Sequence, residues 1–248
     1  KFHATISHLG FQQGKNDPSL FTRRSDAGIV ALLLYVDDMV INGTDHVGIQ
    51  RLKEGLHASF HLKDLGELSY FLGLEVSRDS RGLLLSQHKY ITDLLDDHHF
   101  VDCKPVSTPM ELNLRLGQDS GDLLPDGKAY RSIVGSLIYL SATHPDISYA
   151  VQVVSQFMAA PRADHLPVVH YILRYLQGTR DVGILFPSTG EIRLRAFSDS
   201  DFAGCVDTRR STSGWCVQFG SSFISWRCKK QDKVSKSSTE AEYRSMSE

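Results

Sequence analysis

The chain has 248 residues, with 27 Lys and Arg against 29 Asp and Glu, 11 His and 4 Cys. Its 41% hydrophobic and 23% charged residues are typical of globular domains and exclude disordered and fibrous classes. The longest apolar run, from Ile29 to Val36, is too short to span a membrane. We therefore expect one or two globular domains, no membrane partner, and an intracellular, non-secreted protein whose four scattered cysteines fit a reducing compartment.

The net charge of −2 does not indicate a nucleic-acid-binding protein, but the charge is unevenly distributed. Residues 191–248 carry 10 Lys and Arg against 8 Asp and Glu, and the excess lies in residues 227–236. A short basic run is most often a solvated surface, and a phosphate-contacting patch is the alternative. The candidate nucleic-acid-binding residues are Arg227, Lys229, Lys230, Lys233 and Lys236.

Strand and helix patterns alternate over the first hundred residues. A β-rich run from Ile29 to Val36 and a second from Met39 to Ile41 predict a β-hairpin with Asp37 and Asp38 at its tip. The spacing of apolar residues predicts further elements: a helix over 45–60, strands over 70–76 and 82–85, and a helix over 87–97.

The middle of the chain opens with a segment of different composition. Residues 101–127 contain three prolines and three glycines without a clear period, so we expect a linker or an extended crossing segment. Three helices are predicted after it: over about 128–142, from Pro145 to about 158, and from near Pro161 to Gly178.

Strand patterns return after the helices, at residues 184–186, 192–198, 215–219 and 222–227. Trp215 and Trp226 are expected to pack within this sheet, and stacking on nucleic-acid bases is the alternative. A last helix is predicted from Ser238 or Thr239, with a capping box between Thr239 and Glu242. The fold class is therefore α+β, with a helical middle and an incomplete final sheet whose covering helix is only starting.

The paired aspartates Asp37 and Asp38 are the first candidates for chemistry. Neighbouring strand residues normally point to opposite faces, but at a hairpin tip both carboxylates can lean toward one site. Carboxylate oxygens are hard ligands suited to Mg²⁺, and two such metals support phosphoryl transfer. The alternative is a polar turn, because aspartate is common in turns.

Nine short motifs then point to a family. The sequence Tyr-Val-Asp-Asp between apolar strands resembles the catalytic hairpin of reverse transcriptases. Together with eight other motifs, this sequence is similar to the Pol polyproteins of Ty1/copia-type retrotransposons, in which the motifs stand in the same order. The similarity covers nearly the whole chain, which also resembles shortened plant reading frames of this kind. The motifs occupy residues 17–21, 34–43, 63–73, 84–90, 103–109, 130–140, 144–150, 211–214 and 237–243.

This resemblance implies an organisation along the chain. It implies a primer-template or an RNA–DNA hybrid as partner, together with the upstream and downstream parts of the polyprotein. It implies the cytoplasm or nucleus as location, with the mitochondrion as the alternative for a plant fragment. The expected parts are the C-terminal part of a reverse transcriptase palm at 1–100, a linker at 101–127, a helical thumb or connection region at 128–180, and the N-terminal part of a ribonuclease H-like domain at 181–248.

The resemblance also implies the catalytic and metal-binding residues. Asp37 and Asp38 match the paired aspartates of the polymerase, and Asp199 and Glu240 match the first catalytic aspartate and the glutamate of ribonuclease H. The expected cofactor is Mg²⁺ or Mn²⁺. For Glu240 the alternative is an acid that only stabilises a helix N-terminus.

The remaining acids of both family sites fall outside this chain, before Lys1 and after Glu248. We therefore expect a fragment of an RNA-directed DNA polymerase with ribonuclease H that is inactive alone, so its status as an enzyme stays open. The alternatives are a non-catalytic remnant that binds nucleic acid or protein, and a decayed element without a selected role.

Overall fold

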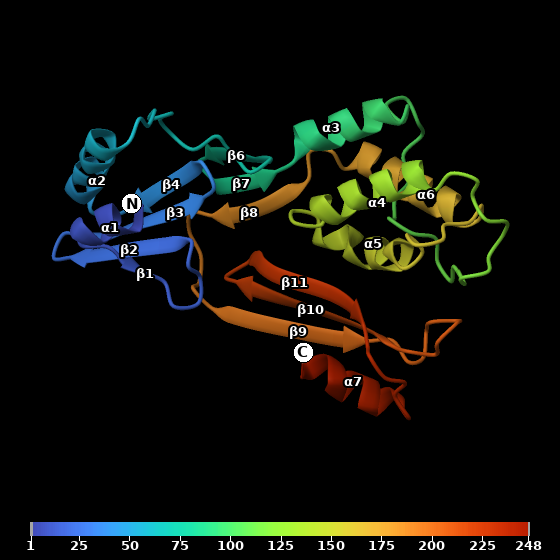
Figure 1. Cartoon of the computed structure of the whole chain (residues 1–248). Helices are drawn as coiled ribbons and strands as arrows, with labels where there is room; N and C mark the ends of the chain where they lie inside the picture. Colours follow the sequence, from blue (N-terminus) through green and yellow to red (C-terminus); the bar gives the residue numbers. More distant parts are fainter. Residues whose placement is uncertain (1, 248) are drawn as a thin grey trace. The chain divides into compact units, whose positions relative to one another are not determined.

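The computed structural model describes residues 2–247 and divides into two compact units, residues 1–71 and 72–248. Across the described residues, three antiparallel sheets and seven α-helices give a mixed α and β structure (Figure 1). No helix within residues 2–247 is both long enough and apolar enough to cross a membrane.

The first unit is built on a four-stranded sheet in which sequential strands are neighbours. Its elements are α1 (Phe2–His8), β1 (Gln12–Gln13), β2 (Leu20–Ser25), β3 (Gly28–Tyr35), β4 (Asp38–Gly43) and α2 (His46–Ser59), followed by the two-residue β5 (Tyr70–Phe71).

Alternation along these strands gives the sheet a buried face. Phe21 and Leu32 lie opposite each other in the β2–β3 register, and both are buried. They form one core with Leu52 and Leu56 of α2. Asp45 caps this helix, because its carboxylate accepts a hydrogen bond from the Gly48 backbone N at 2.7 Å. The hairpin and the helix expected in this unit are therefore both present.

The second unit contains two sheets and a group of helices. Its elements are β6 (Leu74–Asp79), β7 (Gly82–Ser86), α3 (His88–Asp97), α4 (Lys128–Leu140), the 3₁₀ helix η1 (Pro145–Ile147), α5 (Ser148–Ser155), α6 (His165–Gly178), β8 (Gly183–Pro187), β9 (Leu194–Ser200), β10 (Thr212–Phe219), β11 (Ser222–Lys230) and α7 (Ser238–Met246).

Helices α3, α4, α5 and α6 share one apolar core. Tyr130, Leu137 and Leu173 are among its fully buried side chains. The Tyr130 hydroxyl donates a hydrogen bond to the Val154 carbonyl at 2.7 Å, so its polar atom is satisfied inside the core. Residues 101–127 contain no helix or regular strand, as expected, yet Met110, Leu114, Leu116 and Leu124 from this segment pack against the core.

One predicted helix begins later than the sequence indicated. The pattern placed its start near Pro161, but α6 begins at His165. The backbone of residues 161–163 forms hydrogen bonds with another segment instead of with a helix, because Leu124 N donates to Pro161 O and Ala163 N donates to Asp122 O. These two bonds form a β-bridge that competes with the helix.

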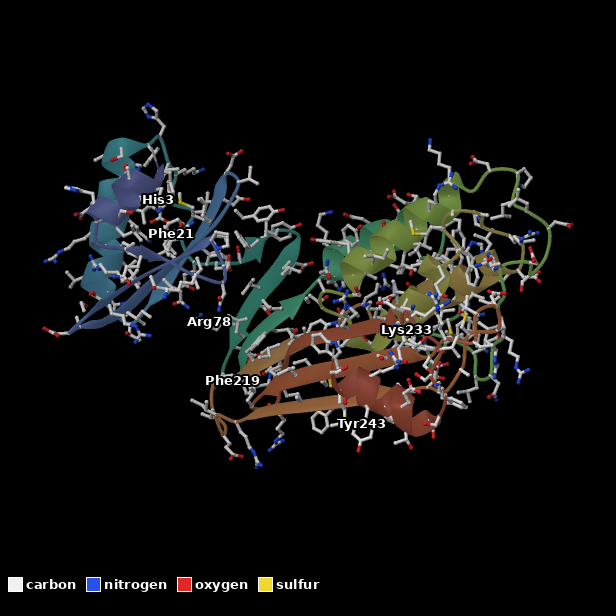
Figure 2. The ribbon with its side chains drawn as sticks, turned by 60° about the horizontal axis from the view of Figure 1, so that its bottom comes forward. His3, Phe21, Arg78, Phe219, Lys233 and Tyr243 are labelled. Atoms are coloured by element: carbon white, nitrogen blue, oxygen red, sulfur yellow. The ribbon has the colours of Figure 1, made fainter. Side chains whose placement is uncertain are left out.

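Strand β8 joins the sheet of β6 and β7 rather than the last sheet. Its Ile184 lies opposite Leu85 of β7. The last sheet has the order β11–β10–β9, and α7 packs against it (Figure 2). Gln231 fixes this packing, since its side-chain amide donates to Ala241 O at 2.9 Å and to Ser213 Oγ at 3.0 Å.

Candidate functional site

The first candidate site is the tip of the β3–β4 hairpin. Tyr35 lies opposite Asp38 in the strand register, which leaves Val36 and Asp37 as the turn. Val36 adopts a φ of 50°, a conformation that is strained for a β-branched residue, so the two strands hold this turn in place. Both aspartates are exposed.

The carboxylates of Asp37 and Asp38 are available to a ligand. Among residues 2–247, neither carboxylate takes part in a hydrogen bond or an ion pair. Two adjacent hard oxygen donors at an exposed tip suit a divalent cation such as Mg²⁺. Their donor chemistry therefore fits the metal that the sequence indicated.

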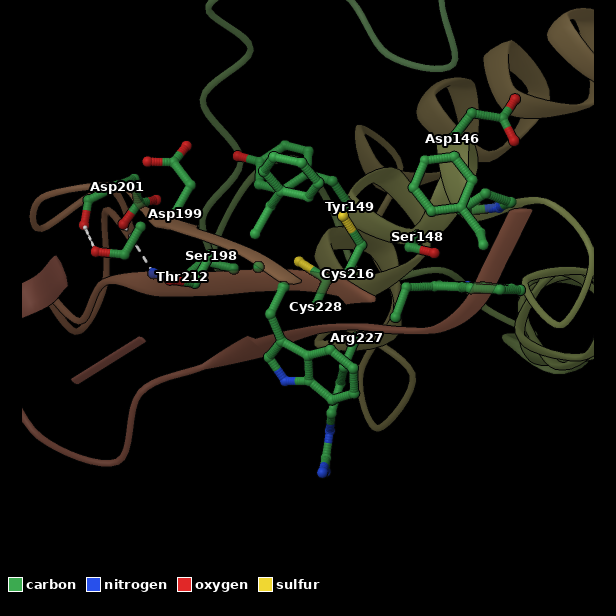
Figure 3. Close-up of a pocket in the computed structure, with 17 residues that line it drawn as sticks. Asp146, Ser148, Tyr149, Ser198, Asp199, Asp201, Thr212, Cys216, Arg227 and Cys228 are labelled. Carbon is green, nitrogen blue, oxygen red and sulfur yellow. Dashed lines mark hydrogen bonds between the residues drawn. The ribbon is translucent and has the colours of Figure 1, made fainter. Parts of the chain in front are cut away.

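The second candidate site is a cavity of about 680 Å³ in the second unit. Strands β9, β10 and β11 line it together with η1 and the start of α5. Figure 3 shows Asp199 and Asp201 at one end of this cavity and Asp146 at the other. The apolar side chains that line this cavity include Tyr149, Phe197 and Trp226.

Asp199 lies in β9 and Asp201 follows directly after the end of this strand, so the two acids that line the cavity are two positions apart. Asp199 lies opposite Gly214 of β10, which has no side chain to fill the space beside the carboxylate. Asp201 is fixed by the Thr212 backbone N, which donates to Oδ1 at 2.7 Å. Burial, and then the Asp201 charge, raise the pKa of Cys228 to about 11. The same two causes, in this order, raise the pKa of the Tyr149 hydroxyl.

Glu240 lies in the first turn of α7, where its carboxylate is already engaged. It accepts hydrogen bonds from the Lys236 backbone N at 2.8 Å and from Arg244 Nη2 at 2.8 Å. These contacts, with the backbone N–H of Lys236 as the largest cause, lower the pKa of Glu240. Ser237 completes the cap, because its Oγ accepts from the Glu240 backbone N at 3.1 Å.

The capping box predicted between Thr239 and Glu242 is therefore wrong by two residues. The cap residue is Ser237, and the acid three positions later is Glu240. Both pairs have the required spacing, but Glu240 accepts its backbone hydrogen bond from Lys236 N, one residue before the cap, rather than from Ser237 N as a capping box requires.

The structure places Asp199 and the helix that carries Glu240 on opposite faces of the sheet. Ser213 points to the α7 face, because it contacts Gln231, which also bonds Ala241 O of α7. Ser200 lies opposite Ser213 and shares that face, so the preceding residue Asp199 points to the other face. Among residues 2–247, no group of three or more His, Cys, Asp or Glu side chains is positioned to hold a metal ion.

The basic run does not form one continuous surface. Lys230 Nζ contacts Cys205 Sγ at 2.9 Å, and Lys229 Nζ lies 4.0 Å from a carboxylate oxygen of Asp232. Lys229 and Lys230 are neighbours on β11 and therefore point to opposite faces. The exposed members of the run are Arg227, Lys233 and Lys236.

Cys205 is a feature that the sequence did not indicate. Burial opposes ionisation of its thiol, but the hydrogen bond from Lys230 Nζ, together with the nearby backbone N–H groups of Thr208 and Asp207, outweighs it and lowers the pKa to about 7. The lysine lies 25 residues further along the chain, so no local pattern could have revealed the pair.

Trp226 is half-buried and lines the cavity. Its indole Nε1 donates to the Ser141 carbonyl at 2.8 Å, which ties β11 to the residue that ends α4.

Comparison with known proteins finds matches along nearly the whole chain. Residues 1–112 match the family model described as reverse transcriptase (RNA-dependent DNA polymerase). The Retrovirus-related Pol polyprotein from transposon RE1 of Arabidopsis thaliana is 47% identical over 238 residues. That alignment covers 96% of this chain and 16% of the polyprotein, so the chain spans about a sixth of that relative.

Two shorter relatives are matched over most of their own length. An uncharacterized mitochondrial protein of Arabidopsis thaliana is 44% identical over 215 residues, which cover 87% of this chain and 89% of the relative. A putative transposon Ty5-1 protein of Saccharomyces cerevisiae is 31% identical over 247 residues, covering 98% of this chain and 80% of the relative. No solved structure matches the chain.

Proposed function

The chain belongs to the reverse transcriptase (RNA-dependent DNA polymerase) family of copia-type transposon Pol polyproteins, and we propose that it descends from two metal-dependent activities. One is extension of a primer by nucleotidyl transfer on a template. The other is hydrolysis of the RNA strand of an RNA–DNA hybrid. We propose further that this chain, by itself, carries out neither reaction.

The observation that carries the polymerase assignment is the exposed acid pair on the hairpin. Asp37 and Asp38 stand at the tip of β3–β4, inside the residues that match the reverse transcriptase model. Their carboxylates would hold Mg²⁺, which supplies charge stabilisation for the transferred phosphoryl group. Held between two paired strands, the acids are presented to solvent in a fixed orientation.

The ribonuclease H assignment is supported by Asp199 and Glu240, which lie in a strand and in a first helical turn. Their arrangement argues for descent without activity. Glu240 is bound by Arg244 and by the Lys236 backbone, and Asp199 faces the opposite side of the sheet. A two-metal centre needs carboxylates that converge on shared ions, and this pair does not converge.

Calorimetric titration with Mg²⁺ and Mn²⁺ tests the metal assignment. We expect weak binding that is reduced in Asp37→Asn and in Asp199→Asn. The matched controls are Asp26→Asn in the β2–β3 turn and Asp232→Asn after β11, which remove a carboxylate from the same units. Binding that is equal in all four variants would overturn the assignment of these residues.

Activity assays test the second half of the proposal. We expect no Mg²⁺-dependent primer extension and no cleavage of an RNA–DNA hybrid above a no-protein control. Extension that disappears in Asp37→Asn would keep the family assignment and refute the proposed inactivity.

A second candidate function is nucleic-acid binding without catalysis, favoured by the exposed Arg227, Lys233 and Lys236. Three phosphate contacts predict that log K falls with log salt with a slope of about −2.7, whereas five contacts predict about −4.5. Fluorescence anisotropy with an RNA–DNA hybrid at several salt concentrations separates these values. Affinity that is independent of salt would exclude the basic run as the binding surface.

A further inference from the structure

Cys205 and Lys230 form a contact that joins two segments of the second unit. Lys230 Nζ lies 2.9 Å from Cys205 Sγ, and both side chains are half-buried. Cys205 belongs to the loop after β9, and Lys230 is the last residue of β11. The thiol therefore touches a primary amine and is still partly accessible to a small solute.

The backbone on both sides of this contact is fixed. Within the loop, Arg209 N donates to Cys205 O at 2.9 Å. The base of the loop is tied to the end of β11, because Gln231 N, directly after Lys230, donates to Ser211 O at 2.8 Å. Groups that are held in contact react faster with each other than with the same groups free in solution.

The same loop contains a buried hydroxyl group without a partner. Thr208 Oγ1 is buried, and within residues 2–247 it makes no hydrogen bond. It lies three positions after Cys205, in the turn that the Arg209 bond closes. A thiol sulfur is a weak hydrogen-bond acceptor, whereas an oxygen bound to that sulfur is a stronger one. An oxygen added to Cys205 would therefore supply an acceptor in the loop where a buried donor lacks one.

We propose that Cys205 and Lys230 are a modification site, at which a peroxide oxidises the thiol and the two side chains become joined by a sulfur–nitrogen bond. The product is a sulfenamide link between Cys205 Sγ and Lys230 Nζ. The reactant from solution is hydrogen peroxide or another hydroperoxide. This inference does not rest on the proposed function.

The modification has two steps. In the first, the thiolate sulfur attacks one oxygen of hydrogen peroxide, the O–O bond breaks, and the departing hydroxide is protonated to water, which leaves a sulfenic acid. In the second, Lys230 Nζ gives up one proton to solvent and attacks this sulfur, the S–O bond breaks, and the departing hydroxide takes a second proton from the nitrogen. One thiol, one amine and one peroxide thus give one S–N bond and two waters. The sulfur is oxidised by two electrons, and the peroxide is reduced by two.

Cys205 is better suited to the first step than two of the other cysteines. The thiolate, and not the thiol, is the nucleophile. The pKa of Cys205 is lowered to about 7, whereas burial raises the pKa of Cys103 and is the main cause that raises the pKa of Cys228 to about 11. Peroxide should therefore react at Cys205 before it reacts at Cys103 or Cys228.

Peptide mapping after treatment with hydrogen peroxide tests the link in the purified chain. Trypsin cuts after Lys and Arg, so it releases Cys205 in the peptide 196–209. A modified Lys230 is not cut and stays in the peptide 230–233. We expect these two peptides to be joined, with a mass two hydrogens below their sum, and to separate again after treatment with dithiothreitol.

Lys230→Arg separates the amine from its charge. A guanidinium keeps a positive charge beside Cys205, but it stays protonated and does not act as a nucleophile. We expect the joined peptide to be lost, and labelling of the Cys205 sulfenic acid by dimedone to rise severalfold because the second step is blocked. The matched control is Lys229→Arg, on the opposite face of β11, which should leave both signals unchanged.

The inference is overturned if peroxide-treated wild type contains no joined peptide and is labelled by dimedone as strongly as Lys230→Arg. A join between peptides 196–209 and 228–229 would also overturn it, because the bond would then be a disulfide to Cys228. A joined peptide that carries one extra oxygen would rule out a direct S–N bond. A link that forms equally well in concentrated urea would show that the folded contact is not its cause.

Discussion

Replacing Lys230 by methionine should slow the alkylation of Cys205 at neutral pH. The lysine Nζ lies 2.9 Å from Cys205 Sγ, and its hydrogen bond stabilises the thiolate over the thiol. Together with the nearby backbone N–H groups of Thr208 and Asp207, it outweighs the effect of burial and lowers the pKa from 9.0 to about 7. Methionine keeps the aliphatic length of the side chain and removes the charge.

The expected size of the effect follows from the ionised fraction. At pH 7 a thiol with a pKa near 7 is about half ionised, and one with a pKa near 9 is about 1% ionised, a ratio of about 50. The more acidic thiolate is intrinsically about six- to tenfold less nucleophilic over this interval. Cys205 should therefore react about five- to eightfold faster than an ordinary thiol of equal access, and Lys230→Met should remove most of this advantage.

The assay is the rate of reaction with iodoacetamide between pH 5.5 and 10, with the four cysteine-containing peptides separated by mass spectrometry. Cys228, whose pKa burial raises to about 11, serves as a slow internal reference. Lys233→Met is the matched control, since this lysine is exposed nearby on the same segment. A pH midpoint for Cys205 that is the same in wild type and in Lys230→Met would refute the reasoning.

Three further predictions concern stability. Burial lowers the pKa of His144, so on acidification the unfolded chain takes up the proton before the folded chain does. The contribution of His144 to the free energy of unfolding is therefore complete above about pH 6.5 and falls below that pH by up to about 1.4 kcal/mol per pH unit. Denaturant unfolding at pH 5.5 and 7.5 should show a smaller loss in His144→Gln. Ser237→Ala should cost α7 about 1 kcal/mol by amide exchange, and Ser238→Ala much less. Leu137→Ala, at a fully buried position, should cost about 2–5 kcal/mol of unfolding free energy, whereas the exposed Ile138→Ala should cost little.

The features that the sequence predicted well depend on neighbours in the chain. The β3–β4 hairpin follows from two apolar runs around Asp37 and Asp38, and its turn needs no distant partner. Helix α2 follows from apolar spacing after the Asp45 cap. In each case the local preference and the tertiary contacts agree, so the pattern was sufficient.

The features that the sequence missed depend on contacts between distant segments. The delayed start of α6 results from a bridge between residues 122–124 and 161–163, which no helical pattern contains. The pattern predicts that the last strand ends at Arg227, before four of the five basic residues of the run. Strand β11 continues to Lys230, so alternation separates Lys229 from Lys230. The site at Cys205 likewise requires the loop after β9 to meet the end of β11.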